Sequence, residues 1–321
     1  MKNKPILIVA GEPNSIFSEI FFKTVNKKKF ISPIILIVSF DLFKKQMKFL
    51  NFDIKLNLIK SSDLGKIELS NKNIYIININ YNNLNIFNKI SNHSNLYLKK
   101  CFDVAFKILK KKITYKFING PVNKKYFLKK KYFGITEYIS KKFNKKNNAM
   151  LIFNKELSVC PLTTHLPLKH VPKSINKKII KKKIILINDF YKKIIGFKPK
   201  IAITGLNPHC ESMDKFNEDE KIIKPTVKYL KTKNINIKGP FSADTIFIKN
   251  NRDNYDVIVG MYHDQVLTPI KTIYEYDAIN ITLGLPFLRV SPDHGPNENM
   301  IGLNLSNPLS LKRALEFLDD K

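Results

Sequence analysis

The stretch Asp256-Val-Ile-Val-Gly-Met-Tyr-His-Asp-Gln265 runs from a short apolar segment into a turn that carries His263. His165 and His209 follow similar apolar runs, in Thr-Thr-His-Leu-Pro-Leu and Gly-Leu-Asn-Pro-His. Short β-prone runs that end in Pro, Asp or Asn turns are typical of buried strands. In α/β proteins the carboxyl ends of parallel strands meet at one edge of the sheet, where active sites form. These stretches therefore predict an α/β fold with the histidines gathered at one edge.

The rest of the chain alternates apolar runs with lysine-rich helical stretches, which indicates a largely parallel sheet covered by helices. Periodic isoleucines predict the clearest helix over 174–195, because Gly196 and Pro199 follow its end. A second helix is expected over 310–318. The expected strands are 5–11, 33–40, 53–59, 73–80, 115–122, 149–154, 157–163, 200–206, 237–240, 256–261 and 278–283.

The length and composition are those of an ordinary globular protein. A chain of 321 residues with 44% hydrophobic content can bury a substantial core, and its length suggests two domains. No apolar run approaches the roughly 20 residues that a membrane span needs, so we expect a cytoplasmic protein with no membrane partner. Cys101, Cys160 and Cys210 form no Cys-x-x-Cys pair and are odd in number, which predicts reduced thiols.

The net charge of +30 raises the possibility of a nucleic-acid partner. Of the 56 basic residues, however, only Arg252, Arg289 and Arg313 are arginine, the side chain best suited to phosphate and base recognition. The lysines are scattered through a chain equally rich in Asn and Ile. We therefore interpret them as solvated helix faces and expect no nucleic-acid partner.

The histidines at the strand ends predict a metal site. Neutral imidazole is the commonest protein ligand for divalent metals such as zinc, and three such ligands leave positions open for substrate or water. Asp264 adjoins His263, and Asp244 lies at another junction between a strand and a turn. Either could orient a histidine ligand or join the metal. For Asp244, the cap of a following helix is an equal alternative.

A second group of residues is suited to binding anions. Lys271, Asn280 and Arg289 follow the His-Asp-Gln turn, and an arginine within an apolar stretch favours a phosphate or carboxylate partner. Loops at 120–124 and 134–137 could add backbone N–H groups and the Thr136 hydroxyl. The chain has no Gly-x-Gly-x-x-Gly fingerprint and no Gly-Lys-Ser/Thr phosphate loop, so a dinucleotide would not be held by a standard Rossmann turn.

Taken in order along nearly the whole chain, these motifs resemble the 4-hydroxythreonine-4-phosphate dehydrogenase family of pyridoxal phosphate biosynthesis. The motifs are Gly11-Glu12-Pro13, Gly120-Pro-Val-Asn-Lys124, Thr163-Thr-His-Leu-Pro-Leu168, Gly205-Leu-Asn-Pro-His209, Gly239-Pro-Phe-Ser-Ala-Asp-Thr245, Tyr262-His-Asp-Gln265, Asn280-Ile-Thr-Leu-Gly-Leu-Pro286 and Asp293-His-Gly295. The resemblance implies two α/β/α domains with a cleft between them, a fold like that of isocitrate and isopropylmalate dehydrogenases. It also implies a homodimer with the active site at the subunit interface. We place the domains at 1–135 plus 270–321 and at 136–269.

By motif position, the resemblance implies that His165, His209 and His263 bind a divalent cation such as zinc, magnesium or cobalt, with His263 reaching into the partner's site. Thr136, Lys271, Asn280 and Arg289 would bind the substrate. The implied reaction is the oxidation of 4-phosphooxy-L-threonine by NAD or NADP, followed by decarboxylation to 3-amino-2-oxopropyl phosphate.

The chain departs from the family pattern at Ile135, where the family usually has histidine. This difference leaves a related substrate open, such as threonate 4-phosphate, with the same chemistry. The loops at 14–17 and 210–213 also lack the family's small residues. From another class, a metal-dependent hydrolase that uses metal-bound water is a further alternative.

Overall fold

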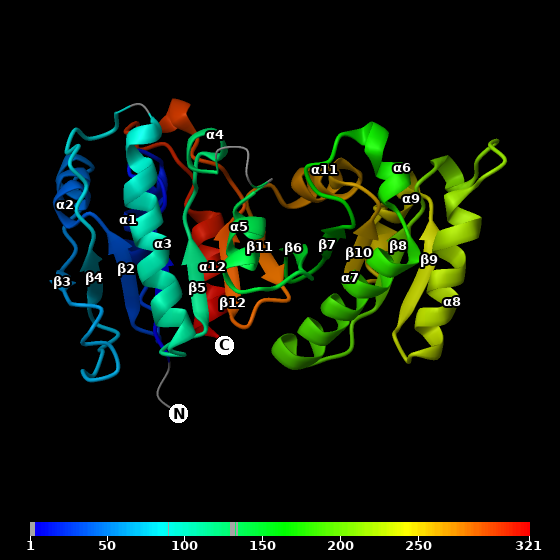
Figure 1. Ribbon diagram of the computed structural model, residues 1–321, viewed down its shortest axis with the longest axis horizontal. Helices are drawn as coiled ribbons and strands as arrows, with labels where there is room; N and C mark the ends of the chain where they lie inside the picture. The colour runs from blue at the N-terminus through cyan, green and yellow to red at the C-terminus, as the bar shows by residue number, and fades with distance from the viewer. Residues whose placement is uncertain (1–3, 89, 129–131, 133) are drawn as a thin grey trace. The chain divides into compact units, whose positions relative to one another are not determined.

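The computed structural model describes residues 4–88, 90–128, 132 and 134–321. The chain divides into two compact units: unit 1 is Met1–Phe143 with Leu285–Lys321, and unit 2 is Asn144–Gly284 (Figure 1). None of the described helices is long and apolar enough to cross a membrane. Cys101, Cys160 and Cys210 are free thiols, as expected.

Unit 1 is built on parallel strands in the order β3-β4-β2-β1-β5-β12. Both central strands, β1 and β2, are buried along their whole length. A strand covered on both faces has no solvent side, so its sequence is continuously apolar rather than alternating. The strands are β1 (Ile6–Val9), β2 (Ile34–Val38), β3 (Leu56–Leu58), β4 (Ile74–Asn78), β5 (Lys116–Asn119) and β12 (Leu288–Pro292).

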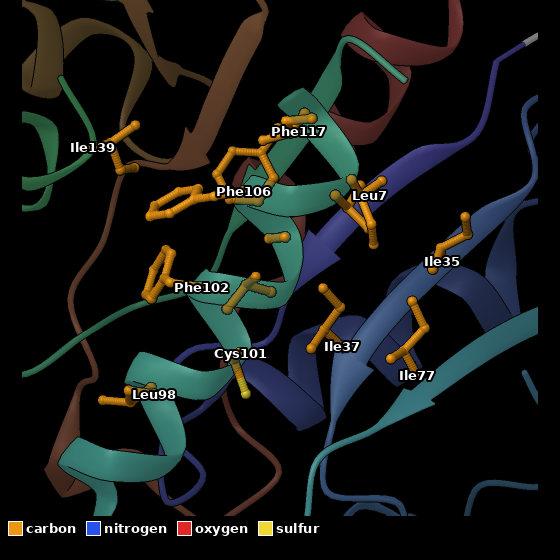
Figure 2. Packing of buried hydrophobic residues seen from close by; sticks show 14 of the residues in the cluster. Leu7, Ile35, Ile37, Ile77, Leu98, Cys101, Phe102, Phe106, Phe117 and Ile139 are labelled. Atoms are coloured by element: carbon orange, nitrogen blue, oxygen red, sulfur yellow. The ribbon is translucent and has the colours of Figure 1, made fainter. Parts of the chain in front are cut away.

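The helices of unit 1 pack on this sheet, with α3 against β1 and β2 and α12 against β12 and β1. Figure 2 shows the apolar cluster between α3 and the strands, which includes Leu7, Ile37 and Phe102. Burial of each such side chain contributes roughly 1.5–3 kcal/mol relative to exposure. The helices are α1 (Phe17–Lys27), α2 (Phe40–Phe49), η1 (Asn92–Ser94), α3 (Asn95–Lys110), α4 (Lys124–Phe127), α5 (Ile135–Lys142), η6 (Glu298–Met300) and α12 (Leu309–Asp319).

Unit 2 contains strands in the order β11-β6-β7-β10-β8-β9. The strands β7, β10, β8 and β9 are parallel, whereas β6 pairs antiparallel with β11 and with β7. The strands are β6 (Ala149–Phe153), β7 (Ser158–Pro161), β8 (Ile201–Thr204), β9 (Ile237–Phe241), β10 (Val257–Gly260) and β11 (Ile279–Leu283). The helices are η2 (Leu168–His170), α6 (Val171–Ser174), α7 (Lys177–Phe190), η3 (Tyr191–Ile195), η4 (Pro208–Cys210), η5 (Asp219–Ile223), α8 (Lys224–Thr232), α9 (Ala243–Ile246), α10 (Lys249–Arg252) and α11 (His263–Tyr274).

The α/β class is confirmed, and each expected strand is present, in a shorter form except for β9, which extends one residue further, to Phe241. The strand β12 was missed, since its sequence Leu-Arg-Val-Ser-Pro carries an arginine and ends in proline. The predicted helix over 174–195 is α7 continued by η3, and it ends at Gly196 with a φ of 103°. Glycine adopts this left-handed conformation without a steric penalty.

The unit limits lie further along the chain than the domain limits expected at 135/136 and 269/270. The first expected limit falls at the start of α5, whose Tyr138 ring lies 5.8 Å from Phe102 in the core of unit 1. The second falls inside α11, whose Val266 and Ile270 are buried in the core of unit 2. A helix belongs to the unit whose core buries its apolar face. The observed limits therefore lie after α5 and after α11 rather than at the start of α5 and inside α11.

Candidate functional site

The three histidines follow three adjacent parallel strands of unit 2. His165 follows β7, His263 begins α11 directly after β10, and His209 lies in η4 after β8. The strand β10 pairs with β7 on one side and with β8 on the other, both in parallel. Because parallel strands run in the same direction, their carboxyl ends share one edge of the sheet. The histidines therefore belong to one edge.

Two of the three rings lie next to each other. The ring centroids of His165 and His263 are 5.8 Å apart, with the planes inclined by 35°. His209 instead places its Nδ1 3.4 Å from the Ser242 hydroxyl. In the part of the chain that the structure describes, no group of three His, Cys, Asp or Glu side chains is close enough to hold a metal. The imidazoles suit a metal in residue type and in their position at the strand ends.

Asp264 is placed to orient His263. The Nδ1 of His263 lies 2.6 Å from the Asp264 carboxylate, which is itself 80% exposed. A proton on Nδ1, donated to this carboxylate, leaves the Nε2 lone pair available to a metal. Asp244 does not cap a helix, because the N-cap of α9 is Ser242 and Asp244 lies exposed in the first turn.

The turns that carry His165 and His209 have an unusual backbone. Their φ angles are 49° and 53°, in the left-handed region, and Cys210 follows at 62°. This conformation costs a residue other than glycine roughly 1–2 kcal/mol. Such residues persist where surrounding contacts hold them, and they cluster at functional sites. One such contact is the Thr163 hydroxyl, which donates to the Met261 carbonyl over 2.8 Å and so joins the His165 turn to the end of β10.

Gln265 fixes the ends of β10 and β8 relative to each other. Its Oε1 accepts hydrogen bonds from the Met261 N–H at 2.7 Å and from the Thr204 hydroxyl at 2.9 Å. Its Nε2 donates to the Gly205 carbonyl at 2.8 Å. Gln265 was not singled out from the sequence, although it lies two residues beyond His263 in the motif Tyr262-His-Asp-Gln265.

Arg289 and Thr136 of unit 1 are in contact. The Arg289 side chain is only 1% exposed; its Nε donates to the Asn119 Oδ1 over 2.8 Å and its Nη1 to the Thr136 hydroxyl over 3.2 Å. Burial lowers the pKa of the guanidinium to about 10, and the nearby Glu137 carboxylate opposes the shift. The group therefore stays charged at neutral pH, and a buried cation favours an anionic partner. Asn119 was not recognised from the sequence.

The other two expected substrate residues belong to unit 2. Lys271 lies in the last turn of α11 and is partly buried. Asn280 lies on β11, and its buried Oδ1 has no hydrogen-bond partner among the described residues. A buried amide oxygen without a partner is costly, so it is a candidate for contact with a ligand.

Glu12 is a buried carboxyl group at the carboxyl end of β1. It is 2% exposed, and its Oε1 accepts a hydrogen bond of 2.8 Å from the Ser94 hydroxyl. Its Oε2 has no partner within the described residues. Burial raises the pKa of this carboxyl to about 7, partly offset by the Ser94 bond. In the sequence, Glu12 was recognised only as part of the Gly-Glu-Pro motif, and its burial was not expected.

The raised pKa of Glu12 predicts a pH dependence of stability. Since the folded pKa of about 7 exceeds the unfolded value of 4.5, the folded state binds the proton more tightly. Stability is then lost as the pH rises from 4.5 to 7, by about 3 kcal/mol from this group. Urea unfolding across this range should show that Glu12→Gln lacks this part of the decline. Equal pH slopes in the two proteins would contradict the assignment.

The chain matches known proteins along most of its length. Residues 29–318 match the model of the pyridoxal phosphate biosynthetic protein PdxA. The chain is 37% identical to a 4-hydroxythreonine-4-phosphate dehydrogenase from Sulfurihydrogenibium sp., over 97% of this chain and 96% of that protein. It is 34% identical to a D-threonate 4-phosphate dehydrogenase from Pectobacterium atrosepticum, over 58% of this chain and 57% of the relative.

Solved structures agree with the fold described above. A 4-hydroxythreonine-4-phosphate dehydrogenase from Klebsiella pneumoniae superposes with a TM-score of 0.84 at 25% identity, covering 98% of this chain and 97% of that one. An isocitrate dehydrogenase from Methylococcus capsulatus gives a TM-score of 0.50 at 10% identity, covering 97% and 83%. At that identity the second likeness concerns the fold alone, and it agrees with the architecture expected from the sequence.

Proposed function

The chain belongs to the family of the pyridoxal phosphate biosynthetic protein PdxA, and from this we propose that it oxidises and decarboxylates 4-phosphooxy-L-threonine, that is, 4-hydroxythreonine 4-phosphate. NAD accepts the hydride, and the product is 3-amino-2-oxopropyl phosphate. The observation that carries this proposal is 37% identity to a 4-hydroxythreonine-4-phosphate dehydrogenase over 97% of the chain.

The proposed reaction has two steps. In the first, the carbinol C–H bond breaks, its hydride passes to the nicotinamide, and the hydroxyl proton leaves to a base or to solvent. In the second, the bond from the α-carbon to the carboxylate breaks, carbon dioxide leaves, and the resulting enolate takes up a proton. The protein must align the carbinol hydrogen and stabilise the negative charge that develops on the carbonyl oxygen.

His165, His209 and His263 are the residues that would hold the divalent cation. A bound cation supplies Lewis-acid chemistry, polarising the substrate oxygens and stabilising the enolate charge. Imidazole ligands favour zinc or cobalt over magnesium, which prefers oxygen ligands. Asp264 orients His263 through the contact at its Nδ1. Asp244 stays a candidate for a supporting role.

The substrate would be bound by cationic and polar side chains. Arg289 presents a planar guanidinium that Asn119 and Thr136 already hold in place, which suits a phosphate or carboxylate. Lys271 and Asn280 of unit 2 are also proposed as substrate-binding residues. From the family we also propose a homodimer, which light scattering of the purified protein would check. The cytoplasmic location stays a prediction.

A spectrophotometric assay tests the proposed function. Purified protein with NAD, the phosphorylated threonine and zinc, cobalt or magnesium should generate the absorbance of NADH. Removal of the metal by a chelator should abolish the signal, and re-addition should restore it. The absence of NADH with all three metals across a pH series would refute the proposal.

A second candidate substrate is D-threonate 4-phosphate. It is favoured by Ile135, where the family usually has histidine, and by the relative from Pectobacterium atrosepticum. Ile135 begins α5 and packs against the apolar cluster of unit 1. The ratio of the kcat/KM values for the two compounds decides between them.

Restoring the imidazole at this position gives a further prediction. If phosphooxy-threonine is the substrate, Ile135→His should raise kcat/KM for it about tenfold, since a hydrogen bond to a charged group contributes about 1.5 kcal/mol. Ile135→Val is the control that keeps an apolar side chain. No change on the threonine substrate would argue against a role for position 135 in recognising it.

A further inference from the structure

Asp219 is a buried carboxylate that binds the loop leading to His209. It begins η5 and is 0% exposed. Its Oδ1 accepts a hydrogen bond of 2.8 Å from the Leu206 N–H. Its Oδ2 accepts from the Asn207 N–H at 3.2 Å and from the Asn207 side-chain amide at 3.0 Å. Both oxygens are therefore engaged by residues between β8 and His209.

The backbone beside this carboxylate is closely packed. At Gly205, an added Cβ would lie 2.7 Å from the Asp219 Oδ1 and 2.7 Å from the Cys210 Sγ. The loop thus leaves β8, passes against Asp219 and folds back so that Cys210 contacts its start. The left-handed residues His209 and Cys210 lie at this fold-back. Two consecutive strained residues need surrounding contacts to keep their conformation, and Asp219 holds the two residues, Leu206 and Asn207, that lead into them.

We propose that Asp219 is a positioning residue for the metal ligand His209. Hydrogen bonds of a carboxylate to backbone N–H groups are charge-assisted, so they hold the loop more firmly than neutral bonds would. They limit the positions that the His209 ring can reach from the end of β8. This inference rests on the proposed function, because it takes His209 as a metal ligand.

The neighbouring Glu218 provides a matched control. It is also a carboxylate, and its Oε2 accepts one bond of 3.3 Å from the same Asn207 side chain. It is partly exposed, and this bond comes from a side chain, whereas Asp219 also accepts from two backbone N–H groups of the loop. Asp219→Asn removes the charge and leaves one oxygen for two backbone N–H groups, so the new NH₂ group faces one of these donors. Glu218→Gln also removes a charge, but its remaining oxygen can still accept the single bond from Asn207.

The test is a titration of the purified full-length protein with Co²⁺. Calorimetry and the visible absorption of the bound ion measure the binding, and the thermal unfolding midpoint of each variant is measured separately. Asp219→Asn should weaken Co²⁺ binding by about 10- to 100-fold, the usual loss when a group that orients a ligand is removed. Glu218→Gln should change it less than about threefold. Asn207→Ala removes the side-chain bonds to Asp219 and Glu218 but keeps the two backbone bonds to Asp219, and it should weaken Co²⁺ binding about fivefold.

Each outcome decides between positioning and a purely structural role. If Asp219→Asn lowers the thermal midpoint but binds Co²⁺ as tightly as the unsubstituted protein below that midpoint, the inference is wrong. If Asp219→Asn does not fold, Asn207→Ala decides, and unchanged Co²⁺ affinity in that variant would overturn the inference. If the unsubstituted protein itself binds no Co²⁺, the metal site of the proposed function fails, and the role of Asp219 fails with it.

Discussion

His263→Ala is expected to lower kcat/KM for 4-phosphooxy-L-threonine by about 10³-fold. Loss of a Lewis acid removes several kcal/mol of charge stabilisation, and each 1.36 kcal/mol corresponds to a factor of ten in rate. The His263 side chain is 36% exposed at the start of α11, so its removal leaves little of a cavity. The variant should therefore stay folded, which makes the loss of activity interpretable. Steady-state kinetics and metal analysis of the same sample measure the effect.

His170→Ala is the matched control for this experiment. His170 lies in the same unit and is exposed, and the Ser174 hydroxyl donates to its backbone carbonyl rather than to its ring. Its removal should leave metal content and kcat/KM unchanged. If His263→Ala retained both metal and activity, the assignment of the strand-end histidines would be wrong.

Arg289→Met is expected to raise KM for the phosphorylated substrate by about 10- to 100-fold. A charge-assisted hydrogen bond to phosphate or carboxylate contributes about 1.5–3 kcal/mol. Methionine is similar in volume and apolar, but it leaves the nearby Glu137 carboxylate without its cation, which destabilises a buried site. The thermal midpoint is therefore measured beside the kinetics, and the expected result below that midpoint is weakened substrate binding. The KM of Arg289→Lys should lie between those of the unsubstituted protein and of Arg289→Met, because lysine keeps the charge and lacks the planar guanidinium.

Arg313→Met is the control for the second prediction. Arg313 is also in unit 1, but it lies on α12 with a side chain 38% exposed and pairs with Glu316 at 3.0 Å. Exposed pairs of this kind contribute less than about 1 kcal/mol, so KM should not change. Kinetics with varied substrate at saturating NAD separate KM from kcat. An unchanged KM in Arg289→Met would show that this buried arginine serves the fold and not the substrate.

Most strands could be predicted from the sequence because a strand buried on both faces is a continuous apolar run. A run such as Ile34–Val38 has no polar side, since helices cover the sheet on both faces. The shared edge of the histidines was predictable for a related reason, because parallel strands fix which ends lie together. The strand β12 was not predicted because Arg289 interrupts its apolar pattern. The residue that accepts a hydrogen bond from the Arg289 Nε is Asn119, which lies 170 positions away in sequence.

The groups that support the site depend on contacts that local sequence does not record. Nothing in the cluster Asn217-Glu-Asp-Glu220 distinguishes Asp219, which is fully buried, from its exposed neighbour Glu220. The hydrogen-bond partner of the buried Glu12 is Ser94, which lies 82 positions away. The unit limits likewise depend on which core buries α5 and α11. These contacts join residues that are distant in sequence, so local sequence does not predict them. The order of the motifs along the chain, in contrast, is enough to indicate the family.

The most direct test of the central claim is the stoichiometry of the reaction with substrate labelled in its carboxyl carbon. The protein, supplied with metal and NAD, should form one NADH and release one labelled carbon dioxide for each molecule of 4-phosphooxy-L-threonine consumed. NADH without carbon dioxide would contradict a decarboxylating dehydrogenase. Release of phosphate from the substrate without NADH would point to the metal-dependent hydrolase instead.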